Sequence, residues 1–168
     1  MWFDSFLTWL ANTPFSTTMR ESTWAEPIVE TIHVLTLTLF LGFAILLDLR
    51  LLGLYLTRKR FSQVLAQFNP WLFGGFAVMV VTGTLLFCGD PVSFYHTKPP
   101  FFKAKMIMLV LAGLNVTIFN FGIGRKVAEW DLLPKPPLAA KVAGIVSIVL
   151  WISIVAAGRA IAYALPPP

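Results

Sequence analysis

The sequence predicts an all-α integral membrane protein: an up-and-down bundle of four transmembrane helices, preceded by an interfacial amphipathic helix at the N-terminus. Hydrophobic residues make up 57% of the 168 residues and charged residues only 12%, which is unlike a soluble domain. The chain contains four apolar stretches that are each long enough to cross about 30 Å of hydrocarbon as a helix. The connections between these stretches are short, so neighbouring spans should run antiparallel.

We expect the chain to divide into two parts. Residues 1–26 should form a periplasmic interfacial amphipathic segment, and residues 27–168 should form the four-helix transmembrane bundle. In the first part, apolar residues recur at helical spacing, which predicts a short helix that lies in the plane of the membrane surface. The recurring apolar residues are Phe3, Phe6, Leu7 and Leu10.

The four spans must be helical, because lipid offers no hydrogen-bond partner for exposed backbone polar groups. Proline is tolerated in the first turn of a helix, where its missing N–H would have no partner. We therefore expect helices to start near Pro27, Pro70 and Pro137. The predicted spans are residues 28–56, 70–88, 101–123 and 138–165.

The basic residues flank the apolar stretches, so membrane topology explains the net charge of +5 and no nucleic-acid partner is expected. Lys and Arg concentrate in the first and third connecting loops. This bias places those loops in the cytoplasm and both termini in the periplasm. The basic residues in and next to the two loops are Arg58, Lys59, Arg60, Arg125, Lys126, Lys135 and Lys141.

Ionisable side chains within the spans are the strongest pointers to a site, because hydrocarbon tolerates them only when they face the bundle interior. On the first span, Glu30, His33 and Asp48 lie toward one side of the helix at 100° per residue. Arg50 lies about 160° away from Asp48, so it should instead extend to the cytoplasmic surface. On the third span, Asn115 should lie level with Asp48. We expect these two residues and Arg50 to form an intramembrane polar network.

The polar residues of the outer third of the bundle favour a b-type haem site near the periplasmic face. A neutral imidazole within a helical bundle is a common axial ligand of haem iron, and haem propionates are held by Arg or Lys. Three options remain for the second axial position of the iron: His96, a methionine, or no protein ligand. The residues expected to bind the cofactor are His33, Arg159, Lys103, Lys105, Glu30 and His96, with His33 and His96 as the metal ligands.

A protein with such a site would transfer electrons or act as the membrane subunit of a redox complex, with a redox protein or a quinone as partner. An alternative is a cofactor-free structural or accessory subunit whose polar residues form a buried ion-pair network. A third interpretation is a copper-handling protein that uses Cys88, His96, His33 and a methionine. The sequence contains no hydrolase or nucleotide-binding motif, and its glycine-lined spans are compatible with a homo-oligomer.

Characteristic segments run along nearly the whole chain: FLTWL at residues 6–10, ETIH at 30–33, LDLRLLG at 47–53, FFKAKM at 101–106 and GRAIAY at 158–163. Together they resemble a domain-of-unknown-function family of bacterial four-span membrane proteins. The resemblance implies a multi-pass protein of the bacterial inner membrane, without an assigned activity. A looser likeness extends to copper-resistance D-type and cytochrome b-type four-helix membrane proteins, which place a histidine in the first span. The motif positions implied by the resemblance are Glu30, His33, Asp48, Arg50, Lys103 or Lys105, and Arg159.

Overall fold

The structure is a computed structural model that describes residues 2–97, 99–131, 133 and 135–163. Every regular element in these residues is a helix, and four of the helices are long and apolar enough to cross a membrane. The protein is therefore a multi-pass membrane protein, as predicted. The elements are α1 (Trp2–Ala11), α2 (Pro14–Glu21), α3 (Ala25–Leu52), α4 (Phe61–Gly89), η1 (Ser93–Thr97), α5 (Pro99–Phe121), η2 (Ile123–Lys126), α6 (Val127–Trp130) and α7 (Leu138–Tyr163).

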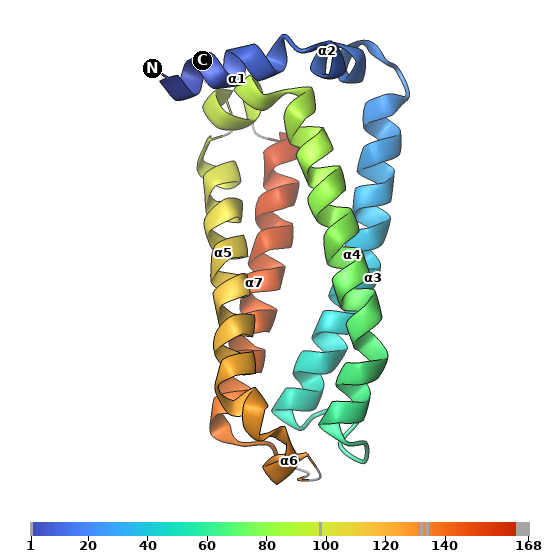
Figure 1. Cartoon of the computed structure of the whole chain (residues 1–168), viewed down its shortest axis with the longest axis vertical. Coiled ribbons are helices and arrows are strands. Elements are labelled where there is room, and N and C mark those ends of the chain that lie inside the picture. Colours follow the sequence, from blue (N-terminus) through green and yellow to red (C-terminus); the bar gives the residue numbers. More distant parts are fainter. Residues whose placement is uncertain (1, 98, 132, 134, 164–168) are drawn as a thin grey trace.

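The predicted up-and-down bundle is confirmed: α3, α4, α5 and α7 alternate in direction, and α1 and α2 lie across one end (Figure 1). We call the end that carries α1, α2 and η1 the outer end, and the end that carries α6 the inner end. These names follow the orientation expected from the basic residues. The last two residues of the fourth predicted span, 164–165, lie outside the described residues.

Helix α3 ends before the predicted residue 56, and its end is set by a glycine. Gly53 adopts a left-handed conformation with φ of 74°, which costs a glycine little. Its N–H donates to the carbonyl of Arg50, and the N–H of Leu54 donates to the carbonyl of Leu49. This pair of bonds is a Schellman motif, which satisfies the last helical carbonyls and turns the chain away.

Helix α4 starts earlier than predicted: it begins at Phe61 and contains Pro70 in its interior. The expectation that Pro70 starts the helix was therefore wrong. Packing outweighs the proline here: Phe61, Val64 and Phe68 recur at helical spacing and are all buried. The start of α4 is also held from outside, since the Asp131 carboxylate accepts hydrogen bonds from the backbone N–H and hydroxyl of Ser62 at 2.8 and 2.6 Å.

The backbone contacts of the four long helices form an open row in the order α4, α3, α7 and α5, rather than a closed ring. α3 packs on α4 and on α7, and α5 packs on α7, whereas no comparable backbone contact joins α4 to α5 in the described residues. α7 approaches α3 closely at Gly144, where an added Cβ would lie 3.2 Å from the carbonyl oxygen of Asp48. The central core cluster consists of Phe40, Ala44, Met79, Ala112, Trp151 and Ile154.

Arg50 closes the inner end and does not extend to the surface, so that prediction was wrong. The side chain is fully buried. Its Nε donates to the carbonyl of Lys59 at 3.1 Å and its Nη2 to the carbonyl of Asp131 at 3.3 Å. Arg50 thus ties two connections together, which gives the buried cation two carbonyl partners, while its Nη1 has none among the described residues. Burial raises the pKa of Asp131, but hydrogen bonds from Ser62 and the charges of Arg60 and Arg50 outweigh burial and lower it overall.

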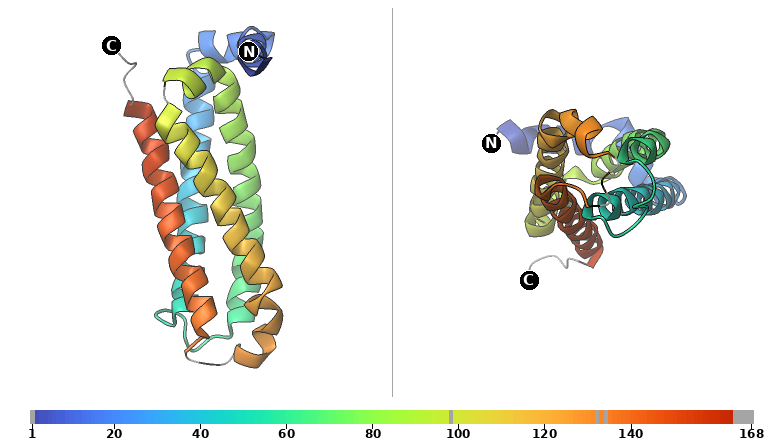
Figure 2. Two further views of the ribbon diagram at one scale, coloured as in Figure 1. Left: turned by 90° about the vertical axis from the view of Figure 1, so that its left-hand side faces the viewer. Right: turned by 90° about the horizontal axis from the view of Figure 1, so that it is seen from below.

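At the outer end, α1 and α2 are attached to the last turn of α4 (Figure 2). The Ser16 hydroxyl is 2.6 Å from the carbonyl oxygen of Cys88 and is completely buried. Arg20 donates to the carbonyls of Gly89 at 3.2 Å and Ala11 at 2.8 Å. On α1, Leu7 faces inward and is buried, whereas the two tryptophans of this helix are exposed. The predicted amphipathic helix therefore forms and has one apolar face that no described residue covers.

We predict that Arg50→Met lowers the free energy of unfolding by about 1–3 kcal/mol, because two carbonyls lose a charged donor in a buried site. Arg50→Lys should recover only part of this loss, since a lysine cannot reproduce the guanidinium fork. Thermal unfolding of the detergent-solubilised protein measures both effects. The control is Arg58→Met, an exposed residue of the same end. Equal stabilities of Arg50→Met and Arg58→Met would contradict the role assigned to Arg50.

Candidate functional site

His33 is the ionisable residue of the outer half whose geometry is best defined. It lies on α3, is half-buried, and its Nδ1 is 2.7 Å from the hydroxyl oxygen of Thr82 on α4. The Thr82 hydroxyl also lies 2.7 Å from the carbonyl oxygen of Val78, the helical partner to which we assign its one proton. With this assignment the hydroxyl accepts from His33, so Nδ1 carries the proton and Nε2 keeps its lone pair. Among the described residues, Nε2 has no hydrogen-bond partner.

The neighbour of Thr82 allows the imidazole to lie against α4. A Cβ added to Gly83 would come within 3.4 Å of His33 Cε1, which is tight for a carbon contact. A larger residue would push the ring away and lengthen the bond from Nδ1 to Thr82. Thr82 was not among the predicted site residues. A threonine next to a glycine in a span was the available signal, although small and hydroxyl residues are also common where helices merely pack.

Lys105 approaches the same region from the other side of the bundle. It is half-buried on α5, and its Nζ would lie 3.5 Å from a Cβ added to Gly158 of α7. Its ammonium is close enough to His33 to interact with it electrostatically, and the Glu30 carboxylate acts on His33 with the opposite sign. Glu30 itself is exposed. The structure therefore brings His33 and Lys105 toward one another, with Glu30 at the edge.

The other predicted site residues lie elsewhere. Arg159 is exposed, and its Nη2 donates to the Tyr163 hydroxyl at 2.8 Å. Lys103 places its Nζ over the Tyr95 ring, 4.5 Å from the centroid, and is also exposed. His96 pairs through Nε2 with an Asp4 oxygen at 3.1 Å. None of these contacts joins His33.

The positions of the possible ligand side chains decide whether the protein alone can hold a metal ion. In the part of the chain that the structure describes, no group of three or more His, Cys, Asp or Glu side chains is placed to hold a metal ion. Cys88, His96 and His33, the residues of the copper interpretation, are therefore not assembled. A site here would have to rely on a ligand set supplied mostly by the cofactor.

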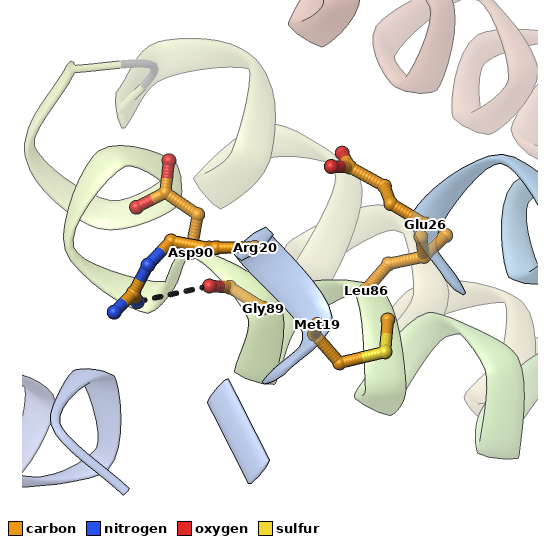
Figure 3. A pocket seen from close by; sticks show the side chains of 6 residues that line it. All are labelled: Met19, Arg20, Glu26, Leu86, Gly89 and Asp90. Atoms are coloured by element: carbon orange, nitrogen blue, oxygen red, sulfur yellow. Dashed lines mark hydrogen bonds between the residues drawn. The ribbon is translucent and has the colours of Figure 1, made fainter. Parts of the chain in front are cut away.

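A small cavity at the outer end lies between α2, α3 and α4, and Figure 3 shows its lining side chains. Its volume is about 20 Å³, which is room for roughly one water molecule. Arg20 and Gly89 form the hydrogen bond drawn across one wall. This cavity is too small for an organic ligand, and we assign it to packing of the α1–α2 segment.

The predicted polar network of the inner half exists only in part. Asp48 is 5% exposed, and among the described residues its oxygen Oδ2 has no hydrogen-bond partner. Ser147 of α7 lines the same cavity as Asp48. Asn115 was the expected partner of Asp48, but its Nδ2 donates to the carbonyl of Ala143 at 3.0 Å. Arg50 belongs to the inner-end connections instead.

Comparison with known proteins gives a family but no activity. The model of a family of unknown function, DUF6644, matches residues 6–164. The chain therefore belongs to this family over nearly its whole length. No curated protein matches the chain, and no solved structure matches it.

We predict that Lys105→Met raises the thermal unfolding temperature of the protein purified without a cofactor. The substitution keeps the side-chain length and removes an ammonium that is costly to hold within a span, a gain on the order of 1 kcal/mol. The matched control is Lys103→Met on the same helix, which is exposed and should change the unfolding temperature little. A lower unfolding temperature for Lys105→Met would show that the ammonium has a structural partner.

Proposed function

We propose that this DUF6644 protein binds a b-type haem in its outer half, with His33 as the protein ligand to iron, and that it serves in membrane electron transfer. The observation that carries the proposal is the bond between His33 Nδ1 and Thr82, because it leaves the Nε2 lone pair available. A histidine that binds a metal is commonly oriented in this way through its other ring nitrogen.

A haem suits the residues better than a bare metal ion. The macrocycle supplies four nitrogen ligands of its own, so one histidine is sufficient to attach it, whereas copper or zinc needs three or four protein ligands. The described residues lack the second arrangement, and the single histidine that haem requires is His33 in this proposal. When bound, haem supplies one-electron oxidation and reduction, which fits an electron-transfer protein or the membrane subunit of a redox complex.

The residues around His33 have separate tasks in this proposal. Thr82 orients the imidazole, and Gly83 leaves space beside the ring. Lys105 is the cation placed to hold a propionate. Arg159 and Lys103 face outward, so they would act at the membrane surface rather than on the cofactor.

The cofactor-free alternative has less support. It requires ion pairs among the polar residues of the outer half, but no ion pair joins Glu30, His33, Lys105 and Arg159 in the described residues. The salt bridge of His96 with Asp4 lies at the exposed surface of the outer end, where such pairs contribute little to stability.

The proposal is tested by the absorption spectrum of protein purified in detergent from cells supplied with a haem precursor. We expect a Soret band that His33→Gly abolishes and that added imidazole restores, since imidazole replaces the lost ligand. Thr82→Val should shift or weaken the band, whereas His96→Ala should leave it unchanged. A colourless protein, or a full Soret band in His33→Gly without imidazole, would refute the proposal.

We further propose that the protein lies in the bacterial inner membrane with its outer end in the periplasm, because Arg58, Lys59 and Arg60 gather at the inner end. In a Cys88→Ala background, Asn12→Cys should react with a membrane-impermeant maleimide in intact cells. Lys59→Cys should react only after the inner membrane is made permeable. The opposite labelling pattern would reverse the orientation.

A further inference from the structure

The inner half of the bundle contains a cavity of about 380 Å³ between α3, α4, α5 and α7. This volume falls in the range of small-molecule binding sites. Most of the lining is aliphatic or aromatic. His33 is not part of it, and the fifteen residues from His33 to Asp48 correspond to about 22 Å along α3. The polar lining residues are Asp48, Asn69, Asn115, Asn120 and Ser147.

The cavity opens sideways, between α4 and α5. These helices touch near their ends, through the stacked rings of Phe87 and Phe102 at 5.4 Å and the edge contact of Phe61 with Phe119 at 5.9 Å. Between these contacts the helices separate, and α7 is visible between them in Figure 1. Lining residues on both sides of the opening are exposed, with Phe73 of α4 at 70% and Val116 of α5 at 50%.

In a protein that spans a membrane, an opening at this height faces lipid. Phe73 and Val116 lie well inside spans α4 and α5, so water is not the medium that meets them. A molecule that enters the cavity from the side must therefore already be dissolved in the bilayer. This requirement limits the occupant to lipophilic molecules.

The polar groups of the cavity determine which head groups of a lipophilic molecule can bind there. Asp48 is the one ionisable residue of the lining, and no Lys, Arg or His contributes to it. A fatty-acid carboxylate or a phosphate head would therefore meet a carboxyl group and no cation. The unpartnered Oδ2 of Asp48 needs a hydrogen-bond donor, and the carboxamide of Asn115 and the hydroxyl of Ser147 lie in the same wall.

The walls favour a flat ring. Aromatic side chains line the cavity from both helix pairs, with Phe40 and Phe76 from α3 and α4 and Phe119 and Trp151 from α5 and α7. Phe40 and Trp151 pack edge to face at 4.7 Å and form one continuous aromatic wall. Rings of this kind bind a planar aromatic ligand by offset or edge contacts. A ring that carries a hydroxyl group would satisfy the walls and Asp48 together.

We propose that this cavity binds a neutral lipophilic molecule of the quinol class, taken from the bilayer between α4 and α5, with a ring hydroxyl that donates a hydrogen bond to Asp48. The hydrophobic tail leaves through the opening into the lipid. The proposal concerns a second site, and it stands whether or not His33 binds haem.

Binding is tested with decylubiquinol, kept reduced, on the protein in lipid nanodiscs, by quenching of tryptophan fluorescence. Trp151 lines the cavity, so Trp151→Phe should remove most of the saturable quenching. Decylubiquinone has no donor hydroxyl and should bind about tenfold more weakly than decylubiquinol. Asp48→Asn should also weaken quinol binding by about tenfold.

A pair of glycine variants tests the opening itself. Gly113→Leu adds bulk to a lining residue, and Gly42→Leu adds the same bulk outside the cavity; neither added Cβ meets an atom within 4 Å. We expect Gly113→Leu to weaken binding at least tenfold and Gly42→Leu to change it less than twofold. Both variants should fold, which keeps the test valid even if Asp48→Asn does not.

Other outcomes would overturn the proposal. These are the absence of saturable quinol binding, equal affinities of the two glycine variants, or tighter binding of dodecylamine than of decylubiquinol. The last result would assign the cavity to lipophilic amines. His33→Gly should retain quinol binding, so failure of the haem proposal and failure of this one are separable.

Discussion

Hydrocarbon supplies no hydrogen bonds, and this constraint explains how nearly every polar side chain of the spans is arranged. The threonines that face the lipid side or the helix interfaces return their hydroxyl protons to their own helix, to the carbonyl four residues earlier. Asn115 bonds across to α7, and Arg50 reaches the carbonyls of two connections. Against this background, three polar atoms lack a hydrogen-bond partner among the described residues: Arg50 Nη1, His33 Nε2 and Asp48 Oδ2. His33 Nε2 and Asp48 Oδ2 lie in different halves of the bundle and carry the two proposals.

The order of helix contacts determines where a ligand can reach the interior. The bundle consists of two helix pairs, α3 with α4 and α5 with α7, and the contact of α3 with α7 joins them. α4 and α5 are the helices of each pair that lie away from this contact. Aromatic contacts hold α4 and α5 together only near the two ends. The inner cavity is a direct result, since no helix covers the space between these contacts. In the outer half, the same division brings His33 from α3 and Lys105 from α5 toward a common region.

The fold was predictable from the sequence because length and apolar composition are sufficient to define membrane spans. All four spans and the amphipathic α1 were predicted in this way. The details that failed were long-range ones. Pro70 was expected to start a helix, but Asp131, sixty-one positions away, caps that helix nine residues earlier. Arg50 was expected to extend to the surface because its two carbonyl partners lie in connections whose positions no local pattern reveals.

The candidate site was predictable in residue type more than in arrangement. His33 was singled out because a histidine within a span is rare, yet its partner Thr82 comes from another helix. Depth along each span was estimated more closely: Asp48 and Asn115, expected at the same level, line one cavity. The rotation of each helix about its axis was not predicted correctly. Arg159 was therefore expected to face the bundle interior, but it is exposed. Small differences in helix rotation decide whether a side chain near a span end faces lipid or the interior.

The unequal lengths of the helices have a mechanical consequence. At 1.5 Å per residue, α3 and α4 are about 42–44 Å long, whereas α5 is about 35 Å long. All of them exceed the roughly 30 Å of the hydrocarbon layer, and η2 and α6 continue the α5 side toward the inner end, so the surrounding lipid must thicken or the whole bundle must tilt. Helix α1, whose tryptophans are exposed, lies above η1 and the α5 side of the bundle in Figure 1, where interfacial anchoring would resist such tilting. Bilayer thickness is therefore a physical variable to which this protein is sensitive, through its shape alone.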